Sequence, residues 1–173
     1  MLAACFDIDG VLIDNTIRLK KCLEIVGVKA IEELSGESKS LFWKLFLSER
    51  FLSLDRPRPL GISYVYRAVN KGYKVVIVTG RPERLREATI NQLNEFRISF
   101  DEIYFRRDND FRKDFVVKPE IIRMLTYKYD FKEFHDDEEE ILRRIAHFIK
   151  NAEFYHHKPN KVVLLNNLLQ WSE

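Results

Sequence analysis

The chain has 173 residues, of which 46% are hydrophobic and 32% charged, and its formal net charge is +2. This length and composition predict one globular domain with room for a small insertion. The near-neutral charge excludes a basic field over the whole molecule, so any contact with nucleic acid must come from a local basic surface.

The sequence carries no sign of disulfides or of a membrane segment. Two cysteines do not make a disulfide framework, and Cys5 is expected as a small buried side chain in the first apolar stretch. That stretch is interrupted by Asp7 too early for a signal peptide, and no run approaches the roughly 20 apolar residues of a membrane span. We expect a cytoplasmic protein without membrane contact and without an obligate protein partner.

Short apolar segments alternate with segments of helical length. The expected strands are residues 2–8, 73–78, 102–105, 131–135 and 153–156. Apolar residues recur at helical spacing in between, for example at Ile141, Leu142 and Ile145. This alternation predicts an α/β fold, a parallel sheet with helices on both faces, with its chemistry beyond the carboxyl ends of the strands. Residues 161–173 are expected to form a closing helix.

Residues 16–58 interrupt the alternation. We expect helices over residues 16–26 and 38–52, then an extended return over 56–59, where two prolines disfavour helix. A helical unit inserted after the first strand would lie over the functional edge as a lid. The predicted division is a core of residues 1–15 and 59–173 and a helical cap of residues 16–58. The cap's aromatic residues are expected to form its core, with a base-stacking platform as the alternative: Phe42, Trp43, Phe46 and Phe51.

Two carboxylates follow the first strand. Asp7 and Asp9 are two residues apart, and Gly10 allows a tight turn that brings both side chains to the same end of the sheet. A carboxylate can attack phosphorus, and a second can protonate the leaving oxygen and then activate water. The alternative is a pair of solvent-facing acids at a strand end.

The second strand leads into Thr79, Gly80, Arg81 and Pro82. Pro82 suits the first position of a helix, which leaves backbone N–H groups and the Thr79 hydroxyl free to face an anion. Alternatively, Thr79 only caps that helix.

Two further fragments complete the pattern. Lys118 precedes Pro119, which predicts a lysine at a loop end, free to reach a cleft or merely solvated. Asp136 and Asp137 end the fourth strand, and Glu138 to Glu140 suit the first turn of the next helix, where Glu139 and Glu140 can pair with Arg143 and Arg144. His135 is expected as a strand residue and not as a metal ligand.

The electrostatics of this set favour a metal. Two like charges about 4 Å apart repel by roughly 4 kcal/mol at an effective dielectric near 20. Four converging carboxylates with only Lys118 nearby therefore need a cation, or they must protonate. An all-oxygen ligand set suits Mg²⁺.

Taken in order, Asp-x-Asp-Gly-Val, Thr-Gly-Arg, Lys-Pro and Asp-Asp resemble the four motifs of the haloacid dehalogenase-like superfamily, across residues 7–137. The resemblance implies a Rossmann-like core, an aspartyl-phosphate mechanism and Mg²⁺. It assigns Asp7 as nucleophile and Asp9 as general acid and base, with Thr79 and Lys118 binding the phosphoryl group. The implied metal ligands are Asp7, the Asp9 carbonyl and Asp137, supported by Asp136.

Residues 79–145 also resemble the 3′-phosphatase domain of phage-type polynucleotide kinase/phosphatases, chiefly through residues 106–122. The resemblance maps that family's additional arginines and aspartate onto Arg81, Arg106 and Asp114. Arginine suits such a site because its planar donors bind phosphate oxygens in pairs. The sequence departs from that family in two ways: it has no Gly-rich Lys-Ser/Thr loop of the kinase half, and its cap is longer than the corresponding segment of that family.

The leading hypothesis is thus a Mg²⁺-dependent phosphatase acting on phosphorylated ends of DNA or RNA, most plausibly 3′-phosphates. The runner-up is a phosphatase for a mononucleotide or another small phosphometabolite, which a helical cap in this position favours. A more distant alternative is a phosphoacceptor domain of the receiver type. Receivers place the acidic pair first and lack the inserted cap.

Overall fold

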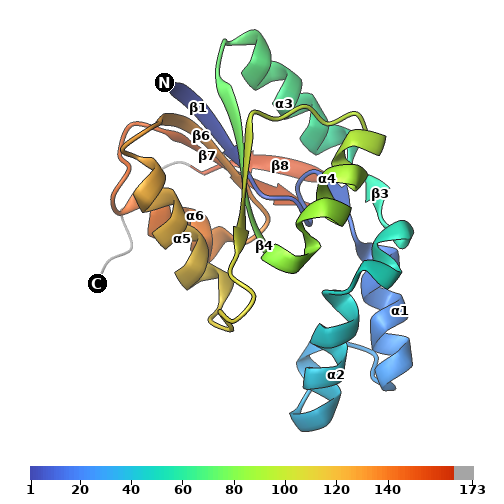
Figure 1. Ribbon diagram of the computed structural model, residues 1–173. Coiled ribbons are helices and arrows are strands. Elements are labelled where there is room, and N and C mark those ends of the chain that lie inside the picture. Colours follow the sequence, from blue (N-terminus) through green and yellow to red (C-terminus); the bar gives the residue numbers. More distant parts are fainter. Residues whose placement is uncertain (166–173) are drawn as a thin grey trace.

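The computed structural model describes residues 1–165. Its centre is a six-stranded sheet with the order β5-β4-β1-β6-β7-β8 (Figure 1). The strands are β1 (Leu2–Phe6), β4 (Lys74–Pro82), β5 (Glu102–Arg106), β6 (Asp130–Asp136), β7 (Glu153–Lys158) and β8 (Lys161–Leu164). All neighbouring pairs are parallel except β7 and β8. The predicted α/β fold is confirmed.

The central strands are buried on both sides. In β1, Ala3 and Cys5 join one core cluster, whereas Ala4 and Phe6 join the other, as the two-residue period of a strand requires. Helices α5 (Asp114–Leu125) and α6 (Glu139–Ala146) cover the first face, and α3 (Pro59–Asn70) and α4 (Arg86–Glu95) the second (Figure 1). Cys5 is buried and free, as expected.

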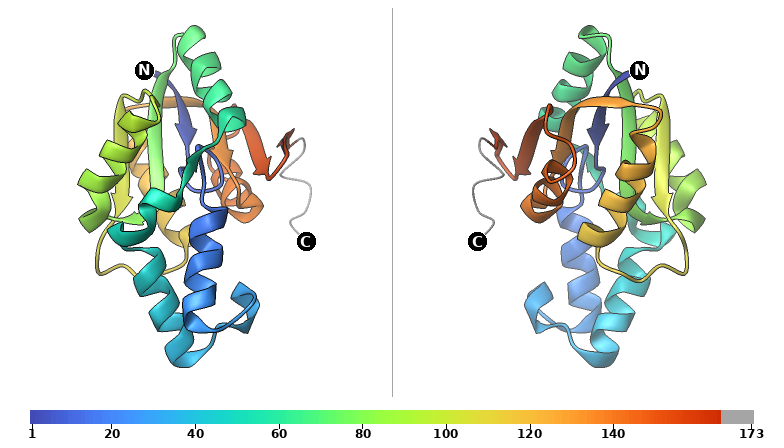
Figure 2. Two further views of the ribbon diagram at one scale, coloured as in Figure 1. Left: turned by 90° about the vertical axis from the view of Figure 1, so that its right-hand side faces the viewer. Right: turned by 90° about the vertical axis from the view of Figure 1, so that its left-hand side faces the viewer.

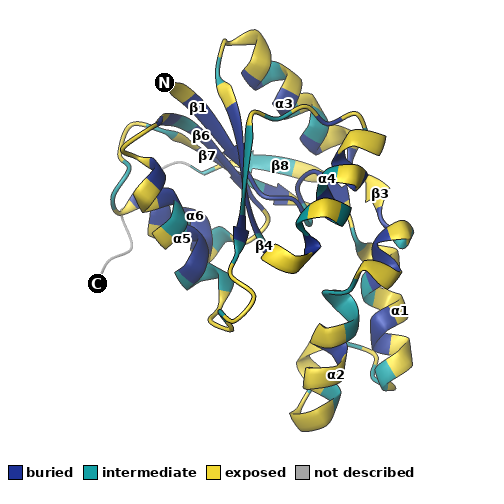
Figure 3. Ribbon diagram, in the orientation of Figure 1, coloured by how far each residue is buried: buried dark blue, intermediate teal, exposed yellow. Residues whose placement is uncertain are grey.

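The segment predicted as a cap, residues 16–58, extends away from the sheet (Figure 2) and is called the cap below. Its elements are α1 (Thr16–Val26), the 3₁₀ helices η1 (Ile31–Glu33) and η2 (Glu49–Leu54), α2 (Gly36–Phe46) and β3 (Arg56–Pro57). β3 pairs antiparallel with β2 (Ile13–Asp14) where the cap joins the core. Phe42 and Phe51 are buried in a small separate cluster, while Trp43 is half-exposed. Figure 3 shows that most of the outer surface of α1 and α2 is exposed.

Two predicted helices are wrong in extent. The helix expected over residues 38–52 ends at Phe46, because Leu47 leaves helical geometry and Ser48 is extended; η2 then follows. The closing helix expected over residues 161–173 is wrong over Lys161–Leu164, which pair with β7 as strand β8. Residues 166–173 of that prediction lie outside the described residues.

The positions of both site prolines are also corrected. Pro82 does not begin a helix: β4 continues through it and pairs Pro82 with Arg106 across a bulge, and η3 (Glu83–Leu85) precedes α4. Lys118 and Pro119 do not end a loop, because α5 already begins at Asp114. The helix tolerates the N–H missing at Pro119 because buried residues on both sides, Val117 and Ile122, anchor it to the core.

Within residues 1–165, no helix combines the length and the apolar character needed to cross a membrane.

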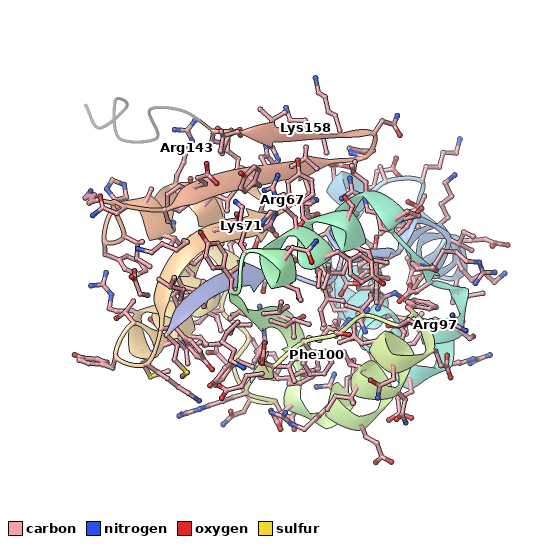
Figure 4. All side chains as sticks on the ribbon, turned by 90° about the horizontal axis from the view of Figure 1, so that it is seen from above. Arg67, Lys71, Arg97, Phe100, Arg143 and Lys158 are labelled. Carbon is pink, nitrogen blue, oxygen red and sulfur yellow. The ribbon has the colours of Figure 1, made fainter. Side chains whose placement is uncertain are left out.

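A buried carboxylate lies under α3. Glu133 of β6 is 1% exposed and contacts Lys71 Nζ at 2.5 Å, His135 Nε2 at 3.3 Å and Arg67 Nη2 at 3.6 Å. Figure 4 labels Lys71 and Arg67 on α3. Although burial alone would raise it, hydrogen bonds with His135 and Lys71 lower the pKa of Glu133 to about 2. The charged form of Glu133 therefore stabilises the packing of α3 on the sheet.

We predict that Glu133→Gln lowers the free energy of unfolding at pH 7 by on the order of 2 kcal/mol, because the charged contacts are lost. The folded-state pKa lies below the ordinary value of 4.5. The stabilisation is therefore present above pH 4.5 and is lost as the pH falls toward 2. Urea unfolding of both proteins at pH 7 and at pH values between 4.5 and 2 measures this difference in stability; a difference that does not shrink over that range contradicts the assignment.

Candidate active site

The predicted acids of the first and last motifs and Thr79 lie toward the carboxyl ends of β1, β6 and β4, three adjacent strands of the sheet. The chain passes from β1 to β4 and β5 on one side and then returns to β6 and β7 on the other, so β1 marks the point where the strand order reverses. Such points bind ligands in open α/β sheets. Asp7 follows β1 directly, and its backbone N–H donates to the His135 carbonyl at 2.9 Å.

A buried lysine joins two of the predicted acids. Lys118 Nζ lies 2.9 Å from Asp7 Oδ2 and 2.9 Å from Asp136 Oδ2, and all three side chains are buried. Although burial alone would lower it, the charges of Asp136 and Asp7 raise the pKa of Lys118 above its ordinary value. Lys118 is therefore a fixed, buried cation at the carboxyl ends of β1 and β6, not a mobile surface lysine.

The two acids that contact Lys118 form a cluster with a third. Asp7, Asp136 and Asp137 each place an oxygen within 4.8 Å of the others. Asp136 has both oxygens engaged, one by Lys118 and the other by the Glu138 backbone N–H at 2.9 Å. Within the described residues, the Asp137 carboxylate has no hydrogen-bond or ion-pair partner. It lies against Gly10, where a Cβ would be 2.3 Å from Asp137 Oδ2 and where φ is +79°.

The pKa values reflect this excess of negative charge. Burial, opposed by Lys118, raises the pKa of Asp7 well above its ordinary value. The Asp137 residue is exposed overall, but its carboxylate is crowded by the sheet edge; desolvation and then the charge of Asp136 raise its pKa to about 7. The cluster carries more negative charge than Lys118 neutralises, which favours protonation of Asp7 or Asp137 or the binding of a cation.

Asp9 belongs to a different set of contacts. Its carboxylate accepts from Arg81 Nε at 2.8 Å and Arg81 Nη2 at 2.9 Å, and it also pairs with Arg18. Although burial alone would raise it, Arg81 and Arg18 hold the pKa of Asp9 below its usual range. The expectation of four carboxylates with only Lys118 nearby is therefore corrected, because Asp9 is neutralised by two arginines.

The Arg81 side chain is 1% exposed and uses all five of its N–H groups. Besides Asp9, it donates to Gln92 Oε1 at 2.8 Å, Thr89 Oγ1 at 3.2 Å and Asp55 Oδ2 at 3.3 Å. Its guanidinium has no donor left for a phosphate in this arrangement.

Thr79 is buried in β4, and its hydroxyl accepts the Arg81 backbone N–H at 3.1 Å. It therefore lies at the sheet edge as predicted and does not cap a helix. Next to it, a Cβ on Gly80 would lie 2.2 Å from Asp114 Oδ2, so only glycine lets the Asp114 carboxylate pack there. Asp114 and Lys118 are one helical turn apart on α5, which directs both toward the sheet edge.

Arg106 pairs with Asp114 and donates to the backbone carbonyls of Arg112 at 2.7 Å and Asp110 at 3.1 Å. It thereby fixes the base of the loop of residues 107–113, which we call the β5–α5 loop. That loop surrounds an open concavity of about 600 Å³ and carries Phe111, which is 89% exposed.

Sequence reasoning missed Arg18 and Asp55, which both lie in the cap. Each side chain is fully buried, and Arg18 Nε lies 2.9 Å from Asp55 Oδ1. Neither belongs to a motif. The one available signal is the spacing of Arg18 and Cys22, which puts an arginine on the buried stripe of α1.

Fold and site together define a phosphatase of the haloacid dehalogenase-like type. The chain belongs to the family described as the polynucleotide kinase PNKP phosphatase domain, whose model matches residues 47–149, more than half of the sequence. It is accordingly a phosphoric monoester hydrolase.

Solved structures share the fold at low sequence identity. A chain of the Pnkp1/Rnl/Hen1 RNA repair complex is 20% identical with a TM-score of 0.64; the match covers 90% of this chain and 42% of that one. A haloacid dehalogenase-like hydrolase from Streptococcus pneumoniae is 16% identical with a TM-score of 0.63, covering 88% and 82%. A class C acid phosphatase from Bacillus anthracis with bound tungstate is 15% identical with a TM-score of 0.55, covering 80% and 53%. No curated protein sequence matches the chain significantly.

Proposed function

We propose that the chain is a Mg²⁺-dependent phosphatase that forms an aspartyl phosphate on Asp7 and acts on 3′-phosphate ends of DNA or RNA. The observation that carries the proposal is the Asp7 carboxylate, which is held by Lys118 through Oδ2 at the end of β1, beside Asp136 and Asp137. Fixing one oxygen leaves the other available to attack phosphorus.

Asp7 and Asp9 account for the bond changes and proton transfers of both reaction steps. An Asp7 oxygen bonds to phosphorus while the bond to the leaving oxygen breaks, and that oxygen takes a proton from Asp9. A water then attacks the aspartyl phosphate and gives its proton to the Asp9 carboxylate, which releases phosphate and restores Asp7. Lys118 and the Thr79 hydroxyl would hold the phosphoryl oxygens. The ionised Asp9 of the present arrangement suits the second step, and an incoming phosphate dianion favours its protonated form for the first.

The acid cluster fits Mg²⁺. It offers carboxylate oxygens only, which hard cations prefer, and it carries more negative charge than Lys118 neutralises. Asp7, Asp137 and the Asp9 carbonyl would hold the ion, while Asp136 would support them because Lys118 and Glu138 already occupy its oxygens. When bound, the ion would supply positive charge that reduces repulsion between Asp7 and the substrate.

The β5–α5 loop supports a nucleic-acid substrate. It is anchored next to Thr79 and Gly80 through Arg106 and Asp114. An exposed aromatic ring beside Arg107 is the combination that stacks a base and attracts its phosphate. Part of one chain of the Pnkp1/Rnl/Hen1 RNA repair complex has the same fold, which points in the same direction. The cap favours the second candidate, a phosphatase of a mononucleotide or other phosphometabolite.

Asp7→Asn is expected to lower turnover of p-nitrophenyl phosphate by at least about 10³-fold without loss of fold, since a neutral amide fills the space but cannot attack. Acid-quenched reactions with ³²P-labelled substrate should show a protein-bound phosphate in the native protein and none in the variant. Asp130→Asn, at the opposite end of β6, is the matched control. Near-normal turnover by Asp7→Asn would refute the nucleophile assignment.

Asp137→Asn is expected to weaken Mg²⁺ binding by about tenfold or more, because one ligand charge is lost. The readout is the Mg²⁺ concentration that half-maximally raises the unfolding temperature, so no activity is needed. Glu140→Gln removes an exposed acid that pairs with Arg144 and should leave that concentration unchanged. An equal Mg²⁺ response in all three proteins would exclude Asp137 as a ligand.

Phe111→Ala is expected to lower kcat/KM for a 3′-phosphorylated single-stranded oligonucleotide about tenfold, because base stacking is lost. Its kcat/KM for p-nitrophenyl phosphate should stay unchanged. Tyr127→Ala, which removes another exposed aromatic ring beyond the far end of α5, is the control. If nucleoside monophosphates are turned over better than the oligonucleotide and Phe111→Ala affects both alike, the second candidate holds.

A further inference from the structure

Asp55 shares both arginine partners of Asp9. It lies at the return of the cap to the core, just before β3, and its side chain is fully buried. Its Oδ1 is 2.9 Å from Arg18 Nε, and its Oδ2 is 3.3 Å from Arg81 Nη2. Two carboxylates thus balance two guanidiniums.

The four charged side chains differ in their access to solvent. Asp9 is 22% exposed, whereas Arg18, Arg81 and Asp55 are at most 1% exposed. Gln92 holds the buried end in place: its amide donates to Asp55 Oδ2 at 3.0 Å and to the Leu52 carbonyl at 2.8 Å, and its Oε1 accepts from Arg81. Asp9 is therefore the member of this group that can turn toward a substrate.

We propose that Asp55 is a positioning residue for Asp9: it is the fixed anion that stays paired with both Arg18 and Arg81 when Asp9 turns from them to the leaving oxygen. A buried guanidinium left without a partner is strongly unfavourable. Without the charge of Asp55, Asp9 is the one anion left to both guanidiniums among the described side chains that contact them, and they hold it more tightly. This inference rests on the proposed function, in which Asp9 protonates the leaving group.

The test compares two esters that differ in how much they need that proton. The phenolate that leaves phenyl phosphate is more basic than p-nitrophenolate, so its departure depends more on a general acid. For Asp55→Asn we expect kcat/KM to fall about 30-fold for phenyl phosphate and less than about threefold for p-nitrophenyl phosphate. Since kcat/KM covers steps only up to formation of the aspartyl phosphate, hydrolysis of the intermediate does not mask the effect.

Glu133→Gln is the matched control, because it also removes a buried, ion-paired carboxylate but lies under α3. It should lower stability and leave the ratio of the two kcat/KM values at the native level. Gln92→Leu removes hydrogen bonds to Asp55 and Arg81 without a change in charge, and it should shift the ratio in the same direction as Asp55→Asn. If Asp55→Asn does not fold, Gln92→Leu provides the test in its place.

An unchanged ratio in folded Asp55→Asn, or in Gln92→Leu if Asp55→Asn does not fold, would overturn the assignment, as would an equal shift in Glu133→Gln. A native protein that hydrolyses neither ester would instead refute the proposed phosphatase mechanism.

Discussion

A buried ammonium group fixes the geometry on which the rest of the site depends. Lys118 enters from α5 and contacts acids that follow two adjacent strands, Asp7 after β1 and Asp136 at the end of β6. Removing one partner of a buried ion pair typically costs about 3–5 kcal/mol, because the other charge is left uncompensated. Lys118 is the fifth residue of α5, so it reaches β1 because that helix already begins at Asp114. The arrangement of Asp7 and Asp136 therefore depends on this early start.

The two aspartates of the first motif have opposite electrostatic surroundings, although one residue separates them. Asp7 belongs to a cluster with three acids and one cation, so that cluster attracts protons or a metal. Asp9 lies in a balanced group with Arg18, Arg81 and Asp55. A carboxylate in the first environment can be activated by a cation. One in the second is kept ionised by two guanidiniums, and in the proposed mechanism it must leave them to reach the leaving oxygen.

The sequence predicted the strands well because buried strands carry short continuous apolar runs, as residues 73–78 do. It also predicted that the four motifs meet, because parallel strands bring their carboxyl ends to one edge. The start of α5 was missed, since Pro119 suggests a helix beginning there, whereas the packing of Val117 and Ile122 overrides the local preference. Two members of the charged group around Asp9 were missed for another reason: Arg18 and Asp55 are distant in sequence from Arg81, and no spacing rule relates charges that meet only through tertiary folding.

The ion pairs of Arg18 and Asp55 restrict how the cap can move relative to the core. Arg18 follows β2 closely and Asp55 precedes β3, so both lie at the junction where the paired strands join cap to core. Because each pairs with core residues, a rigid rotation of the whole cap about this junction would break buried ion pairs. Bending farther out, where α1 and α2 expose most of their surface, would leave those pairs intact (Figure 3). Motion confined to the outer parts of α1 and α2 is therefore compatible with the ion pairs that hold Asp9.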